Sequence, residues 1–99
     1  MIRKVKNFTL DLNKICTGYL VKNDKMCTIG QYLNRCGYSR KDIKNLEPYK
    51  EFERLTGLLS HQIHNINDDS KSSWKRRIVK LKKVFSSVGI NLKVKENNG

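Results

Sequence analysis

An amphipathic segment near the C-terminal end of the sequence constrains the fold most strongly. Its large apolar residues recur at intervals of 4, 3, 4 and 3 positions and are Trp74, Ile78, Leu81, Phe85 and Val88. An α-helix has about 3.6 residues per turn, so these side chains form one apolar stripe. We predict a helix that Asp69 or Ser70 caps and that Gly89 ends. We interpret Trp74 as a core anchor rather than as a platform on which bases stack.

Alternating apolar and polar residues predict strands near both ends of the chain. Residues 8–12 and 90–95 alternate with period two, which is typical of half-buried strands. Residues 18–22 and 25–27 flank the pair Asn23 and Asp24, a combination that favours a hairpin. The sequence therefore predicts a small antiparallel sheet, made from the hairpin and from strands of both termini.

Helical periodicity dominates the middle of the sequence. Residues 28–36 carry one apolar face and end before Gly37, after which Ser39 can cap a second helix and Pro48 can open a third. Residues 60–69 are polar and rich in turn formers, so we predict a connection there. The fold class is α+β, with the sheet packed against three to four helices, the last long, amphipathic and basic. Residues 1–95 form one predicted domain, and residues 96–99 a predicted loose tail.

The charge of the chain is large and unevenly distributed. Lys and Arg number 21 against 9 Asp and Glu, which gives a formal net charge of +12. Residues 1–46 carry +7, residues 47–70 carry −3 and residues 71–99 carry +8. Such a field attracts nucleic acid, an anionic membrane surface or an acidic protein surface. A lysine-rich composition that serves only solubility is the alternative, and it does not account for the acidic middle.

The densest group of basic residues falls on the predicted last helix. No acidic residue interrupts its basic residues, which are Lys71, Lys75, Arg76, Arg77, Lys80, Lys82 and Lys83. At about 100° per residue, five of them span roughly 160° of the helix surface opposite Trp74. Like charges three or four positions apart repel one another. We therefore predict that these residues bind the phosphates of a nucleic acid or another anionic partner.

Residues 28–46 also fit the spacing of a helix-turn-helix unit. Leu33, Gly37 and Ile43 occupy positions typical of such a unit, and Ser39 opens its second helix. In that geometry the residues facing a DNA major groove are Arg40, Lys41, Lys44 and Asn45. The alternative is an ordinary corner between two helices.

Signals for catalysis, cofactors and disulfides are few. His61 and His64 are candidate metal ligands beside Asp68 and Asp69, which leaves a metal-dependent nuclease as a remote alternative. We predict no enzyme activity, no cofactor and no small-molecule substrate. The three cysteines lack a C-x-x-C spacing, and we expect reduced, half-buried thiols. Because no signal peptide or long apolar run is present, we expect a cytoplasmic protein without membrane contact.

Several short motifs resemble those of short, uncharacterised bacteriophage proteins. The shared features are the Met26-Cys27-Thr28-Ile29-Gly30 segment, the Gly37-Tyr38-Ser39 corner, the Asn67-Asp68-Asp69 turn and the final Gly89-Ile90 strand. The resemblance implies a virus-encoded accessory protein in a bacterial host cell. With the charge map, it predicts a protein that modulates or inhibits a host nucleic-acid-handling or defence protein. A sequence-specific helix-turn-helix regulator of transcription is the alternative function.

Overall fold

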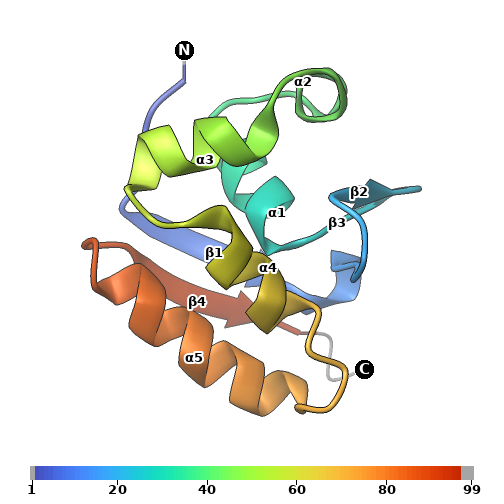
Figure 1. Ribbon diagram of the computed structural model, residues 1–99, viewed down its shortest axis with the longest axis vertical. Helices are drawn as coiled ribbons and strands as arrows, with labels where there is room; N and C mark the ends of the chain where they lie inside the picture. The colour runs from blue at the N-terminus through green and yellow to red at the C-terminus, as the bar shows by residue number, and fades with distance from the viewer. Residues whose placement is uncertain (1, 97–99) are drawn as a thin grey trace.

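The computed structural model describes residues 2–96 of the chain. Short strands come first along it, a run of α-helices follows and one strand comes last, so the predicted α+β class is confirmed (Figure 1). The described elements, including one 3₁₀ helix η1, are β1 (Asn7–Asp11), η1 (Leu12–Lys14), β2 (Val21–Lys22), β3 (Lys25–Met26), α1 (Thr28–Arg35), α2 (Arg40–Asn45), α3 (Pro48–Thr56), α4 (Ser60–Asn67), α5 (Trp74–Ser86) and β4 (Asn91–Lys95). Residues 97–99 of the predicted tail lie outside the described part.

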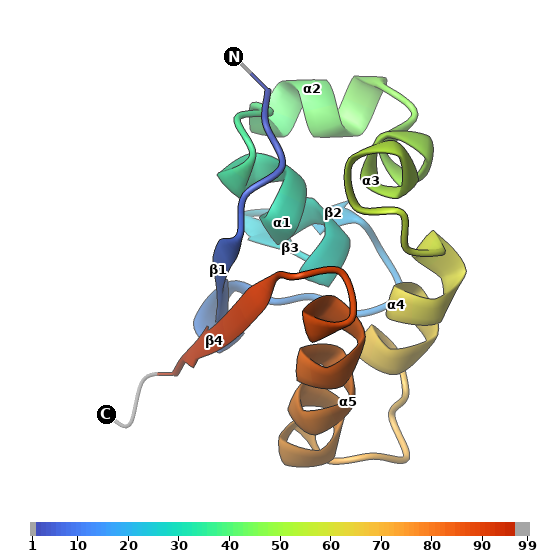
Figure 2. The ribbon, with the colours of Figure 1, turned by 90° about the vertical axis from the view of Figure 1, so that its left-hand side faces the viewer.

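The two terminal strands pair with each other, but in parallel. Phe8 is opposite Leu92 and Leu10 is opposite Val94, and α5 packs along β4 (Figure 2). The prediction of antiparallel pairing was therefore wrong. Alternation marks a strand and its buried face, whereas strand direction depends on how the intervening helices return the chain.

The predicted hairpin is confirmed, although it forms a sheet of its own. Val21 pairs with Met26 and Lys22 with Lys25 in antiparallel register. Asn23 turns the chain with a φ of 57°, a left-handed conformation that Asn adopts more readily than most residues. The hairpin projects from the body of the molecule beside α1 (Figure 1).

Four aromatic rings from different elements form the centre of the core. The Tyr32 ring lies 5.3 Å from that of Phe8 and 5.7 Å from those of Phe52 and Phe85, centre to centre. All four residues are almost completely buried. The pairs of Tyr32 with Phe8 and with Phe52 are edge-to-face, a geometry that stabilises a core by about 0.5–1.5 kcal/mol beyond the area buried. This cluster joins β1, α1, α3 and α5.

The segment predicted as a connection is helix α4. Ile63 is fully buried because α4 packs against α1, α3 and α5. Only Ile63 and Asn67 of this helix are buried, so its sequence lacks the wide apolar stripe by which helices are recognised. Tertiary packing stabilises α4 where its local sequence is a poor guide.

Asn67 ties α4 to two other segments from a buried position. Its Oδ1 accepts hydrogen bonds from the Thr28 amide at 2.9 Å and the Thr28 hydroxyl at 2.6 Å. Its Nδ2 donates to the carbonyl of Cys16 at 3.0 Å and to Asp68 Oδ1 at 2.8 Å. Buried amide groups require such partners, because an unpaired one loses its hydration without compensation. Asn67 therefore fixes the start of α1 against α4.

Helix α5 begins later than predicted. Ser73 is the N-cap, and its hydroxyl accepts a hydrogen bond from the Arg76 amide. Asp69, one of the two predicted caps, instead accepts hydrogen bonds from the Lys71 amide and the Ser72 hydroxyl, so it orders the preceding loop. The predicted end is confirmed, because Gly89 has a φ of 78° and the Ile90 amide donates to the Phe85 carbonyl.

Candidate functional site

The solvent side of α5 carries a continuous group of cations. The exposed positions of this helix are 75, 76, 79, 80, 82, 83 and 86, and none of them is acidic. We call five of these residues the basic face, and they are Lys75, Arg76, Lys80, Lys82 and Lys83. The structure therefore places these five predicted residues together on one surface.

A shallow hollow lies across the first two turns of the basic face. It has a volume of about 560 Å³, and its lining residues are Ser72, Ser73, Lys75, Arg76, Val79 and Lys80. Val79, one of the residues that line this hollow, is 64% exposed. Cations thus surround a small apolar patch, a combination that suits contact with a polyanion carrying both phosphates and less polar groups.

Arg77 does not belong to the basic face. It is only 7% exposed, and its guanidinium donates from Nε to the Ser72 carbonyl at 2.9 Å and from Nη1 to the Asn67 carbonyl at 3.0 Å. The same group lies over the Trp74 ring. Its inclusion among the anion-binding residues was therefore wrong. Helical position explains the difference, since Arg77 is on the side of α5 that faces α4.

Lys71 is exposed in the loop just before α5. The acid closest to it along the chain, Asp69, has a lowered pKa because the Ser72 hydroxyl and then the Lys71 amide donate hydrogen bonds to its carboxylate. The charges of Lys80 and Arg77 lower this pKa further. Asp69 is thus an ionised part of the loop, and Lys71 stands beside the N-terminal end of the basic face.

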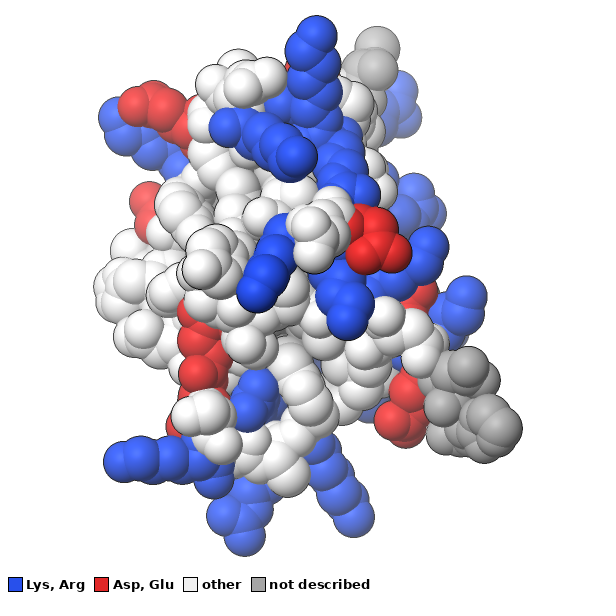
Figure 3. Space-filling model, turned by 90° about the vertical axis from the view of Figure 1, so that its right-hand side faces the viewer, with Lys and Arg blue, Asp and Glu red and all other residues white. Residues whose placement is uncertain are grey.

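A second hollow opens between the hairpin and the start of α5. Its volume is about 390 Å³, and its lining residues are Ile15, Cys16, Thr17, Lys22, Asn23, Asp24, Lys25 and Trp74. Figure 3 shows the side of the molecule that carries these segments, with Lys and Arg above and below a mostly uncharged area. Sequence reasoning missed this hollow, because its two sides are some fifty positions apart along the chain.

Trp74 borders this second hollow. It is half-buried, and it is not among the residues packed in or against the hydrophobic core cluster. The interpretation of Trp74 as a core anchor was therefore wrong. Its position at the first residue of α5 places it beyond the end of the core, although it shares the apolar stripe.

The candidate DNA-reading residues lie on α2, far from α5. The two helices are at opposite ends of the molecule in both ribbon views (Figures 1 and 2). Lys41, Lys44 and Asn45 are exposed, whereas Arg40 is half-buried and its Nη2 is enclosed without a hydrogen bond to any of residues 2–96. The Ser39 hydroxyl and the Asp42 carboxylate form a capping box, which confirms the predicted start of α2. At six residues, α2 is only about 9 Å long.

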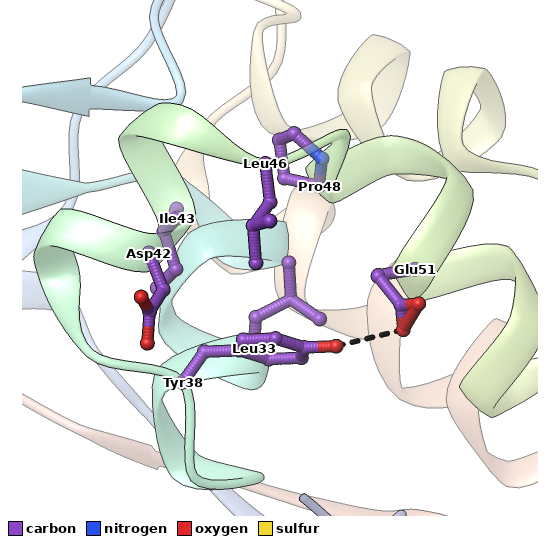
Figure 4. A pocket seen from close by; sticks show the side chains of 7 residues that line it. All are labelled: Leu33, Tyr38, Asp42, Ile43, Leu46, Pro48 and Glu51. Carbon is purple, nitrogen blue, oxygen red and sulfur yellow. Dashed lines mark hydrogen bonds between the residues drawn. The ribbon is translucent and has the colours of Figure 1, made fainter.

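The helical corner itself is held by packing between α1, α2 and α3. Side chains from all three helices meet there, and the Tyr38 hydroxyl donates a 2.7 Å hydrogen bond to Glu51 Oε2 (Figure 4). The space between them is too small for a water molecule. Arg54 also donates to Glu51, and these bonds lower the pKa of the Glu51 carboxyl. These contacts therefore have a structural role and hold α2 and the loop before it against α3.

His61 and His64 share the outer side of α4. His64 Nε2 lies 3.1 Å from Asp68 Oδ2, and the His64 ring contacts Tyr49 edge-on. Within residues 2–96, no three His, Cys, Asp or Glu side chains are grouped as a metal ion requires. The geometry thus brings together one histidine and one carboxylate of the candidate metal site.

The three cysteines are buried thiols, not half-buried as expected. Burial raises the pKa of Cys27 to about 11 and also raises those of Cys16 and Cys36. A thiol with a raised pKa is a poor nucleophile at neutral pH, because the thiolate is the reactive form. The cysteines therefore contribute to packing rather than to a reactive site.

Comparison of the chain with protein-family models, with curated proteins and with solved structures found no match. The resemblance to short bacteriophage proteins stays a prediction. Among residues 2–96, no helix combines the length and the apolar character that crossing a membrane requires.

Proposed function

We propose that this protein binds nucleic acid, with the basic face of α5 against the phosphate backbone. One observation carries the proposal: all five residues of the basic face are exposed cations, and no carboxylate lies among them. Each phosphate that a Lys or Arg neutralises releases condensed counterions, which favours binding. A helix selected for stability alone would intersperse Glu, because like charges on neighbouring turns repel by about 0.2–0.5 kcal/mol per pair.

The apolar side of α5 argues against a membrane surface as the ligand. Leu81 and Phe85 are fully buried in the core, so they are not available to enter a lipid interface. Val79 is the one exposed aliphatic residue of α5. An acidic surface of a host protein lacks the regular phosphate spacing that a helix about 20 Å long can follow.

The proposed activity is binding without catalysis. In a host cell, a phage-type accessory protein of this kind would modulate or inhibit nucleic-acid-handling or defence proteins by occupying their nucleic acid. The α2 surface supports the alternative, a sequence-specific regulator, less well. Its helix is short, and one of its four candidate residues, Arg40, is partly withdrawn from the surface.

Two charge-matched double variants test the proposal. Arg76→Glu with Lys83→Glu reverses the middle of the basic face, and Lys41→Glu with Lys44→Glu reverses the α2 surface by the same total charge. All four side chains are exposed. Binding to a fluorescent 20-nucleotide DNA is measured by anisotropy at two salt concentrations, with random single-stranded and duplex forms.

We expect the α5 variant to bind at least tenfold more weakly and to lose about two contacts from the salt dependence, whose slope is about −0.9 per phosphate on duplex DNA. The α2 variant should stay within about threefold of the wild-type protein. A larger loss in the α2 variant would favour the regulator. If the wild-type protein binds polyglutamate but neither form of DNA, an acidic protein surface is the ligand and the proposal is wrong.

A further inference from the structure

The hollow between the hairpin and α5 has the size of a ligand site. Its volume of about 390 Å³ falls within the range of about 300–1,000 Å³ that small-molecule sites occupy. The hairpin contributes one wall, with Lys22, Asn23, Asp24 and Lys25, and Trp74 contributes to the wall opposite. One large aromatic residue and several polar or charged residues thus line the same hollow.

Trp74 is held in place by the residue beneath it. The guanidinium carbon of Arg77 lies 4.4 Å from the centre of the Trp74 ring, and two carbonyl groups anchor that guanidinium. A ring packed against a cation on one side and bordering a hollow elsewhere is a preformed platform for another flat group. Bases stack on aromatic side chains in this way, with little dependence on sequence.

The rim of the hollow carries groups that suit the rest of a nucleotide. Lys22 and Lys25 supply positive charge for phosphates and outnumber the carboxylate of Asp24 on the same rim. Asn23 and Thr17 carry hydrogen-bonding groups of the kind that base edges or sugars engage. Tyr19 is 58% exposed next to this rim, and Lys22 Nζ lies 5.1 Å from the centre of its ring. A second aromatic side chain is therefore available just outside the hollow.

The hollow adjoins the basic face. Trp74 lines the hollow, and the next residue, Lys75, lines the depression across the first turns of α5. A nucleic-acid strand that leaves the hollow at Trp74 therefore meets the basic face directly.

From this arrangement we infer that the hollow binds an unpaired base and that the protein's ligand is single-stranded nucleic acid. The inference rests on the proposed function and deepens it, since it names the class of nucleic acid. Bases in a duplex are stacked between their neighbours and cannot enter a side pocket, whereas unpaired bases can turn outward. The basic face then binds the phosphates that follow.

The single tryptophan of the chain provides a direct measurement. Trp74 emission is recorded while a 20-nucleotide oligothymidine is added, and again with an abasic oligonucleotide of the same length and charge. Stacking should quench the emission with oligothymidine and leave it nearly unchanged with the abasic strand. Equal quenching by both strands, or none by either, would overturn the inference.

Variants at Trp74 separate the inference from the proposed function. Trp74→Ala should weaken binding of oligothymidine by about 5- to 150-fold and should leave duplex binding within about threefold. Trp74→Tyr keeps a stacking ring and should retain most of the affinity. Thermal unfolding of each variant checks that α5 still folds.

These measurements distinguish a failure of the inference from a failure of the proposed function. If Trp74→Ala weakens oligothymidine and duplex binding equally, the site for a base is wrong, although the basic face can still bind phosphates. If the Arg76→Glu, Lys83→Glu variant retains full binding to both, the proposed function is wrong and the inference fails with it.

Discussion

The guanidinium carbon of Arg77 lies over the ring of Trp74, 4.4 Å from the centre of the indole. Arg76, the residue before it, is exposed on the basic face. Two adjacent arginines thus have opposite environments, because successive residues of a helix point about 100° apart. One joins α5 to the preceding loop and to α4, and the other is available to a ligand.

Arg77 should be important for stability. Arg77→Ala removes a charged donor from the carbonyls of Ser72 and Asn67, and we expect the free energy of unfolding to fall by about 2–4 kcal/mol. Urea unfolding followed by far-ultraviolet circular dichroism measures this change. The matched control is Arg76→Ala, which should change stability by less than about 0.5 kcal/mol. Equal effects of the two substitutions would contradict the burial of Arg77.

Asn67 should be equally sensitive to substitution. Asn67→Leu keeps a similar volume but leaves the Thr28 amide without its side-chain acceptor and the Cys16 carbonyl without its side-chain donor. We expect a loss of about 2–4 kcal/mol in denaturant unfolding, because buried polar groups would be left unpaired. Asn65→Leu, at an exposed position of the same helix, is the control. A loss at Asn67 no greater than at Asn65 would show that the buried network contributes little.

Gly30 should not tolerate a side chain, although it lies inside α1. A Cβ atom there would lie 3.0 Å from both the Leu20 carbonyl oxygen and the Met26 Cβ. Alanine favours a helix over glycine by about 0.5–1 kcal/mol, but displacing the hairpin costs about 1–3 kcal/mol. Gly30→Ala should therefore destabilise the protein in thermal unfolding, while Lys82→Ala, on the exposed side of α5, should not. A raised melting temperature for Gly30→Ala would refute this close packing.

The stability of the protein should fall at alkaline pH. Burial raises the pKa of Cys27 from 9.0 to about 11, so the folded state keeps a proton that the unfolded state releases. The contribution is fully present below pH 9.0 and is lost as the pH rises through about 11. The slope from this thiol is at most about 1.4 kcal/mol per pH unit.

Urea unfolding at pH 8, 9, 10 and 11 measures this slope. Burial also raises the pKa of Tyr32, which titrates in the wild-type protein and in a Cys27→Ala variant alike. The difference between the two proteins therefore isolates Cys27. Identical pH dependence in both would show that the Cys27 thiol is not the group responsible.

Local sequence patterns were sufficient to predict the helices that have a strong apolar periodicity or a clear capping residue. The apolar stripe predicted α5 and its end at Gly89, and Ser39 predicted the start of α2. Helix α4 escaped detection because its sequence is polar and only Ile63 and Asn67 are buried. Its helical state depends on packing against three other helices, which a local pattern does not contain.

In the candidate site too, some residues could be placed from the sequence and others could not. A helical wheel was enough to place Lys75, Arg76, Lys80, Lys82 and Lys83 on one side of α5, because helix geometry is local. The same wheel places Arg77 outside that arc. Its burial, however, depends on where α4 and the loop before α5 lie, which the wheel does not contain. The hollow at Trp74 required the hairpin to approach α5 from a distant part of the chain.

The sequence by itself determined the helices with regular apolar spacing, the strands at both ends and the separation of basic from acidic segments. All of these follow from the periodicity and charge of residues that are close along the chain. Only the tertiary structure decided the parallel direction of β1 and β4, the helical state of α4, the burial of Arg77 and the hollow beside Trp74. Each of these depends on contacts between segments that are distant in sequence, where the free energy of packing outweighs local preference.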